Sequence, residues 1–255
     1  MSDIARLIVD QPASGTWNMA VDQAMLMAAE EANQITLRFY RWSEPTLSLG
    51  YFQKHADRLG HVASASCPLV RRRTGGGAIV HDQELTYSLA VPSKNRWSSK
   101  NAELYDLVHQ EIIKRWADEG VEASLYRDAD KNDVKTDPPM VDPNAFLCFQ
   151  RRSAGDIVCR GHKVVGSAQR RLKNALLQHG SILLARSKAA PELLGITDLS
   201  DWRQNLDCFT TGIANAIRER LGLSLAPGTI SEGEFEIAQQ VQASVFASDG
   251  WSEKR

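Results

Sequence analysis

The chain has 255 residues, of which 43% are hydrophobic and 24% charged, and 30 Lys and Arg residues against 31 Asp and Glu give a formal net charge of −1. This composition is typical of a globular protein and excludes a disordered chain of low hydrophobicity and high charge. The balanced charge excludes the broad basic surface of a general nucleic-acid binder, although a local basic patch stays open. Length allows one large domain, with or without a small extension.

Neither a membrane span nor an export signal is visible in the sequence. No run approaches the ~20 apolar residues that cross a bilayer, and residues 1–10 are too polar for the core of a signal peptide. The four cysteines, Cys67, Cys148, Cys159 and Cys208, form no CxxC pair and no zinc-finger spacing with histidine. We therefore expect reduced thiols, no metal site and a cytoplasmic protein.

The predicted elements of the first hundred residues are short strands around one helix. Residues 6–10 read as a strand, and Thr16 is placed to cap a helix that continues to about residue 31. Alternation of apolar and polar side chains predicts a strand over residues 35–40. Further strand-like runs lie at residues 47–51, 68–71, 78–81 and 85–91.

Helical and strand patterns alternate beyond residue 100. One apolar face predicts a helix over residues 101–119, which Gly120 ends, and a strand follows at 121–126. Residues 127–144 are rich in Asp, Lys and Pro, which is typical of a solvated loop and leaves a mobile lid open. Three strand-like runs at 156–160, 163–170 and 175–184 precede a remainder that reads as helical. It includes residues 206–217 and a helix after the capping box of Ser231 and Glu234.

This order of elements predicts an α+β fold, a mixed β-sheet flanked by helices. Three segments within it carry residues that could bind a ligand. The first, Arg71-Arg72-Arg73-Thr74-Gly75-Gly76-Gly77, lies between two predicted strands and precedes His81-Asp82. Glycines let a ligand approach the backbone, and a run of N–H groups can bind an anion or an acyl carbonyl. A hairpin turn explains glycines alone, but the arginines and the histidine favour a site, which matches neither the Walker loop nor GxGxxG.

The other two segments lie on neighbouring predicted strands. In Gly161-His162-Lys163-Val164-Val165-Gly166-Ser167-Ala168-Gln169, a lysine opens an apolar strand, and small residues leave room for a ligand against it. Leu177-Gln178-His179-Gly180-Ser181 places a histidine in the next strand. A surface lysine at a hairpin and a histidine hydrogen-bonded within a sheet are the simpler interpretations of these segments taken singly.

In this order the segments resemble the lipoate–protein ligase and octanoyltransferase family, which is related to the biotin–protein ligases. Residues 71–82 resemble the family signature, residues 161–169 the second motif with its invariant lysine, and residues 177–181 the third, so the resemblance spans about residues 4–184. It implies a sheet covered by helices, similar to the class II synthetase core, with residues 1–190 as the catalytic domain and 191–255 as a helical extension packed on it. It also implies a lipoyl or octanoyl substrate.

The family contains two chemistries, and the residues before Lys163 bear on the choice. Ligases form an acyl-adenylate from ATP and resemble one another in an Asn-Asp pair about a dozen residues before the lysine, where this chain has Gln150-Arg151-Arg152-Ser153. Here Cys148-Phe149 lies 15 positions before Lys163, which resembles octanoyltransferases of the Gram-positive type, where the cysteine is the nucleophile. Another octanoyltransferase group carries its cysteine after the His-Gly motif, and residues 181–186 contain none. Residues 185–255 are also short for the accessory domain usual in bacterial ligases.

The resemblance therefore implies octanoyl transfer through a thioester on Cys148. A thiolate is both a good nucleophile and a good leaving group, and a neighbouring cation, here Lys163, raises the thiolate fraction and can stabilise the oxyanion. A small buried core residue is the simpler interpretation of a cysteine considered alone. The residues implied in substrate binding come from the three segments: Arg72, Thr74, Gly75, Gly76, Gly77, Ala78, His81, Gly166, Ser167, Ala168, His179 and Gly180. No cofactor is implied, whereas the alternative, an ATP-dependent lipoate ligase, needs ATP and Mg.

The implied partners are an acyl carrier protein as octanoyl donor and a lipoyl-type carrier domain as acceptor, either the glycine cleavage H protein or a dehydrogenase E2 subunit. Neither nucleic acid nor membrane is implied, and we expect a monomer. A third alternative is a carrier-binding protein without catalysis, which would dock through basic positions: residues 71–73, Arg151, Arg152, Arg170 and Arg171. The chain departs from the family at residues 151–154, where transferases often have Pro-Ser, and in the charged insertion at 128–142.

Overall fold

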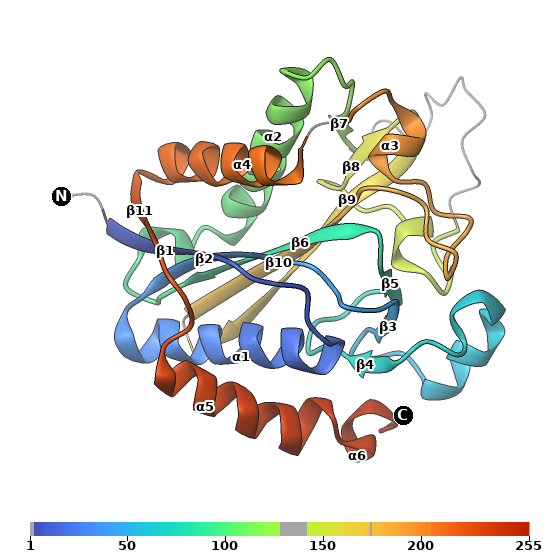
Figure 1. Ribbon diagram of the computed structural model, residues 1–255, viewed down its shortest axis with the longest axis horizontal. Coiled ribbons are helices and arrows are strands. Elements are labelled where there is room, and N and C mark those ends of the chain that lie inside the picture. The colour runs from blue at the N-terminus through green and yellow to red at the C-terminus, as the bar shows by residue number, and fades with distance from the viewer. Residues whose placement is uncertain (1–2, 128–141, 174, 204, 255) are drawn as a thin grey trace.

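A mixed β-sheet of eight strands forms the centre of the computed structural model, which describes residues 3–127, 142–173, 175–203 and 205–254 (Figure 1). The strands in order across the sheet are β11 (Leu223–Pro227), β1 (Asp3–Val9), β2 (Ile35–Tyr40), β6 (Glu84–Val91), β10 (Ala175–Leu183), β9 (His162–Leu172), β8 (Ile157–Cys159) and β7 (Ser124–Leu125). β1 runs parallel to both its neighbours, and the other neighbouring pairs are antiparallel.

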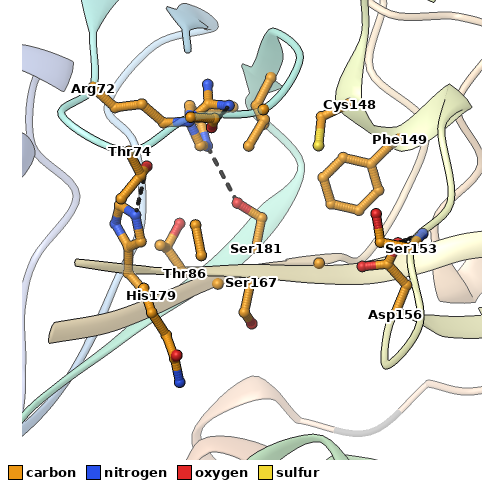
Figure 2. A pocket seen from close by; sticks show the side chains of 18 of the residues that line it. Arg72, Thr74, Thr86, Cys148, Phe149, Ser153, Asp156, Ser167, His179 and Ser181 are labelled. Carbon is orange, nitrogen blue, oxygen red and sulfur yellow. Dashed lines mark hydrogen bonds between the residues drawn. The ribbon is translucent and has the colours of Figure 1, made fainter. Parts of the chain in front are cut away.

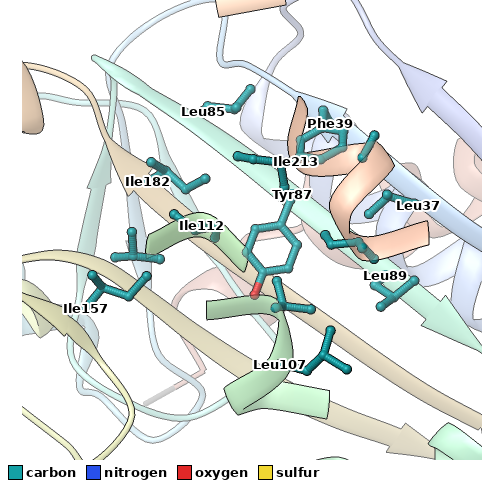
Figure 3. Close-up of a cluster of buried hydrophobic side chains, with 14 of the residues drawn as sticks. Leu37, Phe39, Leu85, Tyr87, Leu89, Leu107, Ile112, Ile157, Ile182 and Ile213 are labelled. Carbon is teal, nitrogen blue, oxygen red and sulfur yellow. The ribbon is translucent and has the colours of Figure 1, made fainter. Parts of the chain in front are cut away.

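Helices cover both faces of this sheet (Figure 1). α1 (Gly15–Ala32) and α5 (Glu232–Val241) pack on one face, and α2 (Asn101–Ala117) and α4 (Leu206–Leu221) on the other. All eight residues of β6 are buried, because a strand covered on both faces presents no side to water. On the α2 and α4 face, Tyr87 and Leu89 of β6 pack beneath Ile112 and Ile213 (Figure 3).

A second, smaller sheet carries the glycine-rich segment. It consists of β4 (Leu69–Arg71), β3 (Thr46–Leu49) and β5 (Ile79–His81), with β3 in the centre. Short 3-10 helices lie at His55–Gly60, Val62–Ser64, Arg96–Ser98 and Cys148–Gln150. The remaining described elements are the short helices α3 (Ile196–Leu199) and α6 (Asp249–Ser252) and a π-helical turn at Gln242–Phe246. The small sheet places the glycines beside the Cys148 turn.

The predicted α+β sheet with flanking helices is confirmed, and so is the capping box of Ser231 and Glu234, in which each side chain accepts a hydrogen bond from the other residue's backbone N–H. Two predictions need correction. The first helix is capped by Ser14, whose hydroxyl accepts from the Trp17 N–H at 3.4 Å, and not by Thr16. The C-terminal part is not entirely helical, because β11 extends the sheet.

Two other expectations concern the region before Cys148 and the membrane. The strand predicted at 121–126 is reduced to the two residues of β7. Of the predicted loop at 127–144, residues 128–141 lie outside the described residues, so the choice between a solvated loop and a lid stays a prediction. Among the helices that are described, none combines the length and apolar character needed to cross a bilayer.

Candidate active site

One cavity of about 250 Å³ collects most of the residues that the sequence predicts for the site (Figure 2). Its walls come from the glycine segment, the Cys148 turn and the strands β9 and β10. The predicted residues that line it are Arg72, Thr74, Gly75, Gly76, His81, Cys148, Lys163, Gly166, Ser167, Ala168, His179 and Gly180. Segments that lie more than a hundred residues apart in the sequence therefore meet at one cavity, as a binding site requires.

Gly77 and Ala78 do not line this cavity and instead hold the cysteine turn in place. Ala78 N–H donates to the Phe146 carbonyl at 2.8 Å, and Cys148 N–H donates to the Ala78 carbonyl at 2.7 Å. A Cβ on Gly77 would lie 2.9 Å from Cys148 N and 3.0 Å from its Cα, so only glycine permits this approach. The structure thus places these two residues against the Cys148 turn, and their contact with substrate stays a prediction.

Cys148 and Lys163 converge at the cavity. Cys148 begins a 3-10 turn and is partly exposed, and its Sγ lies 3.9 Å from Lys163 Nζ. Lys163 is buried, and its stem crosses Gly166, where a Cβ would lie 2.6 Å from Lys163 Cε. The Nζ also lies 5.3 Å from the ring centre of Phe149. The glycine thus leaves the room that lets a strand residue direct its ammonium at the thiol.

The other cysteines lie outside this cavity. Cys159 belongs to β8 and is buried in the hydrophobic core, where burial raises the pKa of its thiol. Burial likewise raises the pKa of Cys67, and Cys208 is exposed on α4. Since the thiolate is the reactive form, the geometry favours Cys148 as the nucleophile and leaves Cys159 as a packing residue.

Asp156 is a site residue that the sequence analysis missed. Its Oδ2 lies 2.8 Å from Lys163 Nζ, and both side chains are buried. The Ser153 N–H donates to the same oxygen at 2.7 Å, so the turn before β8 holds the carboxylate (Figure 2). The sequence could have indicated Asp156, because an acidic residue directly precedes an apolar strand that forms a hairpin with the strand of Lys163.

Arg72 fixes the glycine segment beside the thiol. Its buried guanidinium donates to the Gly75 carbonyl at 2.8 Å, to the Gly77 carbonyl at 2.5 Å and to the Ser48 carbonyl at 2.9 Å. Burial lowers the pKa of Arg72 to about 10, which leaves it charged at neutral pH. Gly76, with φ +93°, lies close to Sγ. Arg72 is therefore a clamp on the loop that faces Cys148.

His179 links the glycine segment to a second carboxylate that the sequence analysis missed. Its Nε2 lies 3.2 Å from Thr74 Oγ1, and its Nδ1 lies 3.4 Å from Asp22 Oδ2. Asp22 also accepts from Arg38 Nη1 at 2.9 Å and from the Ser88 hydroxyl at 2.7 Å. Burial alone would raise the pKa of Asp22, but the hydrogen bond from His179 and the charge of Arg38 outweigh it and lower that pKa.

His81 contributes a buried wall of the cavity. Its ring stacks on Trp42, with centroids 3.8 Å apart, and its Nδ1 lies 2.8 Å from Glu84 Oε1. The hydroxyls of Thr86 and Ser181 donate to the same oxygen at 2.6 and 3.0 Å. These contacts on one carboxylate oxygen fix the orientation of His81.

The Ser167 hydroxyl is bound away from Cys148, on the α2 side of the sheet (Figure 2). It lies 2.6 Å from His109 Nε2 and 2.7 Å from the Tyr87 hydroxyl. His109 Nδ1 donates to the Gly155 carbonyl at 2.7 Å, and burial lowers the pKa of His109 to about 4. His109 is therefore neutral at pH 7, and its Nε2 accepts the Ser167 proton.

Two of the basic positions considered for docking are not available for it. Arg71 is fully buried and donates to the Gly50, Gln53 and Ser252 carbonyls at 3.0, 2.7 and 2.9 Å. Arg72 is buried as described above. Arg71 and Arg72 are therefore structural supports of the small sheet, which corrects the expectation that all of residues 71–73 could contact a carrier.

Comparison with known families bears directly on this arrangement. The model of the lipoyl protein ligase A/B catalytic domain matches residues 14–194, which include all three motifs and Cys148. The chain belongs to this family. The resemblance inferred from the motifs is therefore confirmed.

Relatives within the family agree on the type of enzyme. The octanoyltransferase LipM of Symbiobacterium thermophilum is 33% identical over 282 residues, which cover 98% of each chain. LipM of Brevibacillus brevis is 31% identical and is matched over 98% of this chain and 99% of its own. A bipartite lipoate protein ligase from Thermoplasma acidophilum superposes with a TM-score of 0.74 at 19% identity, covering 98% of this chain and 96% of that one, and so shares the fold.

Proposed function

We propose that the protein transfers an octanoyl group to a lysine of a carrier domain through a thioester on Cys148. The protein is an octanoyltransferase of protein lipoylation, as its relatives' names indicate, and its acceptors are lipoyl-type carrier domains. The observation that carries the proposed mechanism is the approach of Cys148 Sγ to Lys163 Nζ, 3.9 Å, at a cavity of about 250 Å³.

The first step forms the enzyme thioester. Cys148 gives up its thiol proton, its sulfur attacks the carbonyl carbon of the donor thioester, the carbon–sulfur bond of the donor breaks, and the leaving donor thiolate takes up the proton that Cys148 lost. Negative charge develops on the acyl oxygen during the attack, and the ammonium of Lys163 is placed to stabilise it. The buried Arg72 clamp keeps the glycine segment beside the reacting sulfur.

The second step releases the acyl group. The neutral amine of the acceptor lysine attacks the Cys148 thioester, a carbon–nitrogen bond forms, and the carbon–sulfur bond to Cys148 breaks. The amine loses a proton, and the leaving Cys148 thiolate takes up a proton, which returns Cys148 to the thiol. A thioester already carries an activated acyl group, so the exchange requires neither ATP nor Mg. This separates the proposal from the ATP-dependent lipoate ligase alternative.

The partners proposed are an octanoyl-loaded acyl carrier protein as donor and the glycine cleavage H protein or a dehydrogenase E2 subunit as acceptor. Support comes from the chemistry of the site. A partly exposed thiol at the cavity can take an acyl group from a thioester and can be reached by the lysine of an acceptor. The two acceptors are compared by presenting each lipoyl domain to the octanoylated enzyme and measuring transfer.

The experiment that tests the mechanism is intact-mass analysis after mixing the protein with octanoyl acyl carrier protein. We expect a gain of one octanoyl group, which hydroxylamine removes and which the acceptor domain discharges. Cys148→Ala should abolish both acylation and transfer, whereas Cys208→Ala, a matched change at an exposed cysteine outside the cavity, should leave them intact. Full transfer by Cys148→Ala would contradict the mechanism. Lipoate-dependent release of pyrophosphate from ATP would favour the ligase instead.

A further inference from the structure

Asp156 is the buried group of the cavity that the two steps above leave without a role. Its Oδ2 lies 2.8 Å from Lys163 Nζ, the atom that also lies 3.9 Å from Cys148 Sγ. One ammonium thus contacts both a carboxylate and the thiol. The ion pair is fully sheltered, since Asp156 is 2% exposed.

Hydrogen-bond donors surround the carboxylate of Asp156. Ser153 N–H donates to Oδ2 at 2.7 Å, and Lys163 Nζ donates to the same atom. The Tyr105 hydroxyl accepts from Ser167 N–H at 3.3 Å, so its own proton points to Asp156 Oδ1, 3.4 Å away. Burial and then the charge of Asp156 raise the pKa of Tyr105, which keeps this hydroxyl a donor. Every contact therefore brings a proton to Asp156.

The charges around Lys163 make this carboxylate necessary. A buried ammonium without a counter-charge releases its proton, because burial disfavours the charged form. Among the described residues, the other charged or titratable groups near the thiol and the lysine are Arg72 from the glycine segment and Tyr105 and His109 from α2, and Arg152 interacts with Asp156 itself. The two arginines are positive and the α2 groups are neutral, so Asp156 supplies the negative charge that the ammonium needs.

We propose that Asp156 is a positioning residue that keeps Lys163 protonated and directed at Cys148, so that the site works as a cysteine–lysine–aspartate triad. The inference rests on the proposed function and deepens it. Asp156 does not touch the acyl group and acts through Lys163 alone. Its effect is to set the pH above which the site loses its ammonium.

The test is the pH dependence of Cys148 acylation by an octanoyl thioester of a small thiol. The proposal predicts that the wild-type rate falls at high pH, once the ammonium is lost. In Asp156→Asn this fall should move to lower pH by about one to two units, the effect of removing an opposite charge in direct contact. Asp156→Glu should restore much of the wild-type position. Asp201→Asn, the same change at an exposed aspartate, should leave the profile unchanged.

A second measurement separates action through Lys163 from a contribution to folding. In a Lys163→Met background, adding Asp156→Asn should leave the residual acylation rate unchanged, and the neutral pair should fold because no unpaired charge is buried. An equal loss in both backgrounds would overturn the proposal. So would a folded Asp156→Asn variant whose high-pH fall keeps its wild-type position, whatever its rate. Absence of Cys148 acylation in the wild type would instead overturn the proposed function.

Discussion

The two sides of the cavity each bury a carboxylate beside a nitrogen base, but they couple that base to the reacting cysteine differently. On the lysine side, Asp156 pairs with Lys163, whose Nζ reaches Cys148 Sγ. On the histidine side, Asp22 contacts His179, which reaches Thr74 rather than the thiol.

The difference lies in what else each carboxylate binds. Asp22 also accepts a hydrogen bond from Arg38 at 2.9 Å, and the same guanidinium donates to Asp10 at 2.7 Å, so a permanent cation as well as His179 compensates the charge of Asp22. Asp156 pairs with Lys163 in the same direct way that Asp22 pairs with Arg38. Under the proposed mechanism, the carboxylate paired with Lys163 serves catalysis, whereas the carboxylate paired with Arg38 supports the fold and leaves His179 to orient a loop.

The largest effect is expected from breaking the lysine side. Lys163→Met keeps an unbranched stem and removes the ammonium that stabilises the developing oxyanion. We expect acyl transfer to fall by about 10² to 10³-fold, the cost of losing one such donor. Steady-state transfer with a lipoyl domain measures it, and circular dichroism checks folding. A loss no greater than that of a His179→Gln variant would erase the proposed difference between the two sides.

The next effect comes from displacing the cysteine itself. In Gly77→Ala the new Cβ meets the backbone of Cys148 at 2.9 and 3.0 Å, so the turn must move. Because a shift of about 1 Å costs about 10²-fold in rate, we expect a loss of that order in Cys148 acylation. Gly60→Ala is the matched control, since a Cβ there meets nothing within 4 Å. Wild-type acylation in Gly77→Ala would show that the approach of the two loops does not position the thiol.

Groups on the two sides should also lose their contributions to the free energy of unfolding in different pH ranges. Burial lowers the pKa of His109 to about 4, so its stabilising contribution is complete above the unfolded value of about 6.5 and is lost as pH falls towards 4. This amounts to about 2 kcal/mol between pH 7 and pH 5. The lowered pKa of Asp22 acts in the same direction, but only below its ordinary value of 3.8.

Urea unfolding at a series of pH values separates these contributions. His109→Gln, whose amide can both donate and accept, should flatten the decline between pH 7 and pH 5 and leave the decline below pH 4. Asp22→Asn should do the reverse, because it retains His109 and removes the carboxylate. Identical pH profiles for the two variants would contradict the assignment of these ranges to the two sides.

The smallest effect is expected from the loop contact of the histidine side. Thr74→Val keeps the shape of the side chain and removes the hydroxyl 3.2 Å from His179 Nε2. A hydrogen bond of this kind contributes about 1 kcal/mol, so we expect about a fivefold rise in KM for the octanoyl donor with little change in kcat. A fall in kcat alone would instead place Thr74 among the groups that act on the transition state.

Local sequence signals were sufficient for the residues that the motifs contain. Cys148, Lys163 and the glycine segment could be predicted because each belongs to a short run whose order and spacing are characteristic, and the helices could be predicted from their apolar faces. Asp156 and Asp22 gave no such signal. Asp22 lies in the middle of α1, where an acidic side chain among apolar positions is typical of a solvated face, yet it is buried beneath Arg38.

By itself, the sequence determined the family and the α+β class, and it predicted that Cys148 and Lys163 meet at one site, because these depend on residue types at fixed spacing. Only the tertiary structure decided which charges are neutralised and where. It made β11 a strand by pairing it with β1, and it placed Gly77 and Ala78 against the Cys148 turn. Burial and long-range pairing set these outcomes, since a carboxylate becomes the partner of a particular cation only when folding removes both from water.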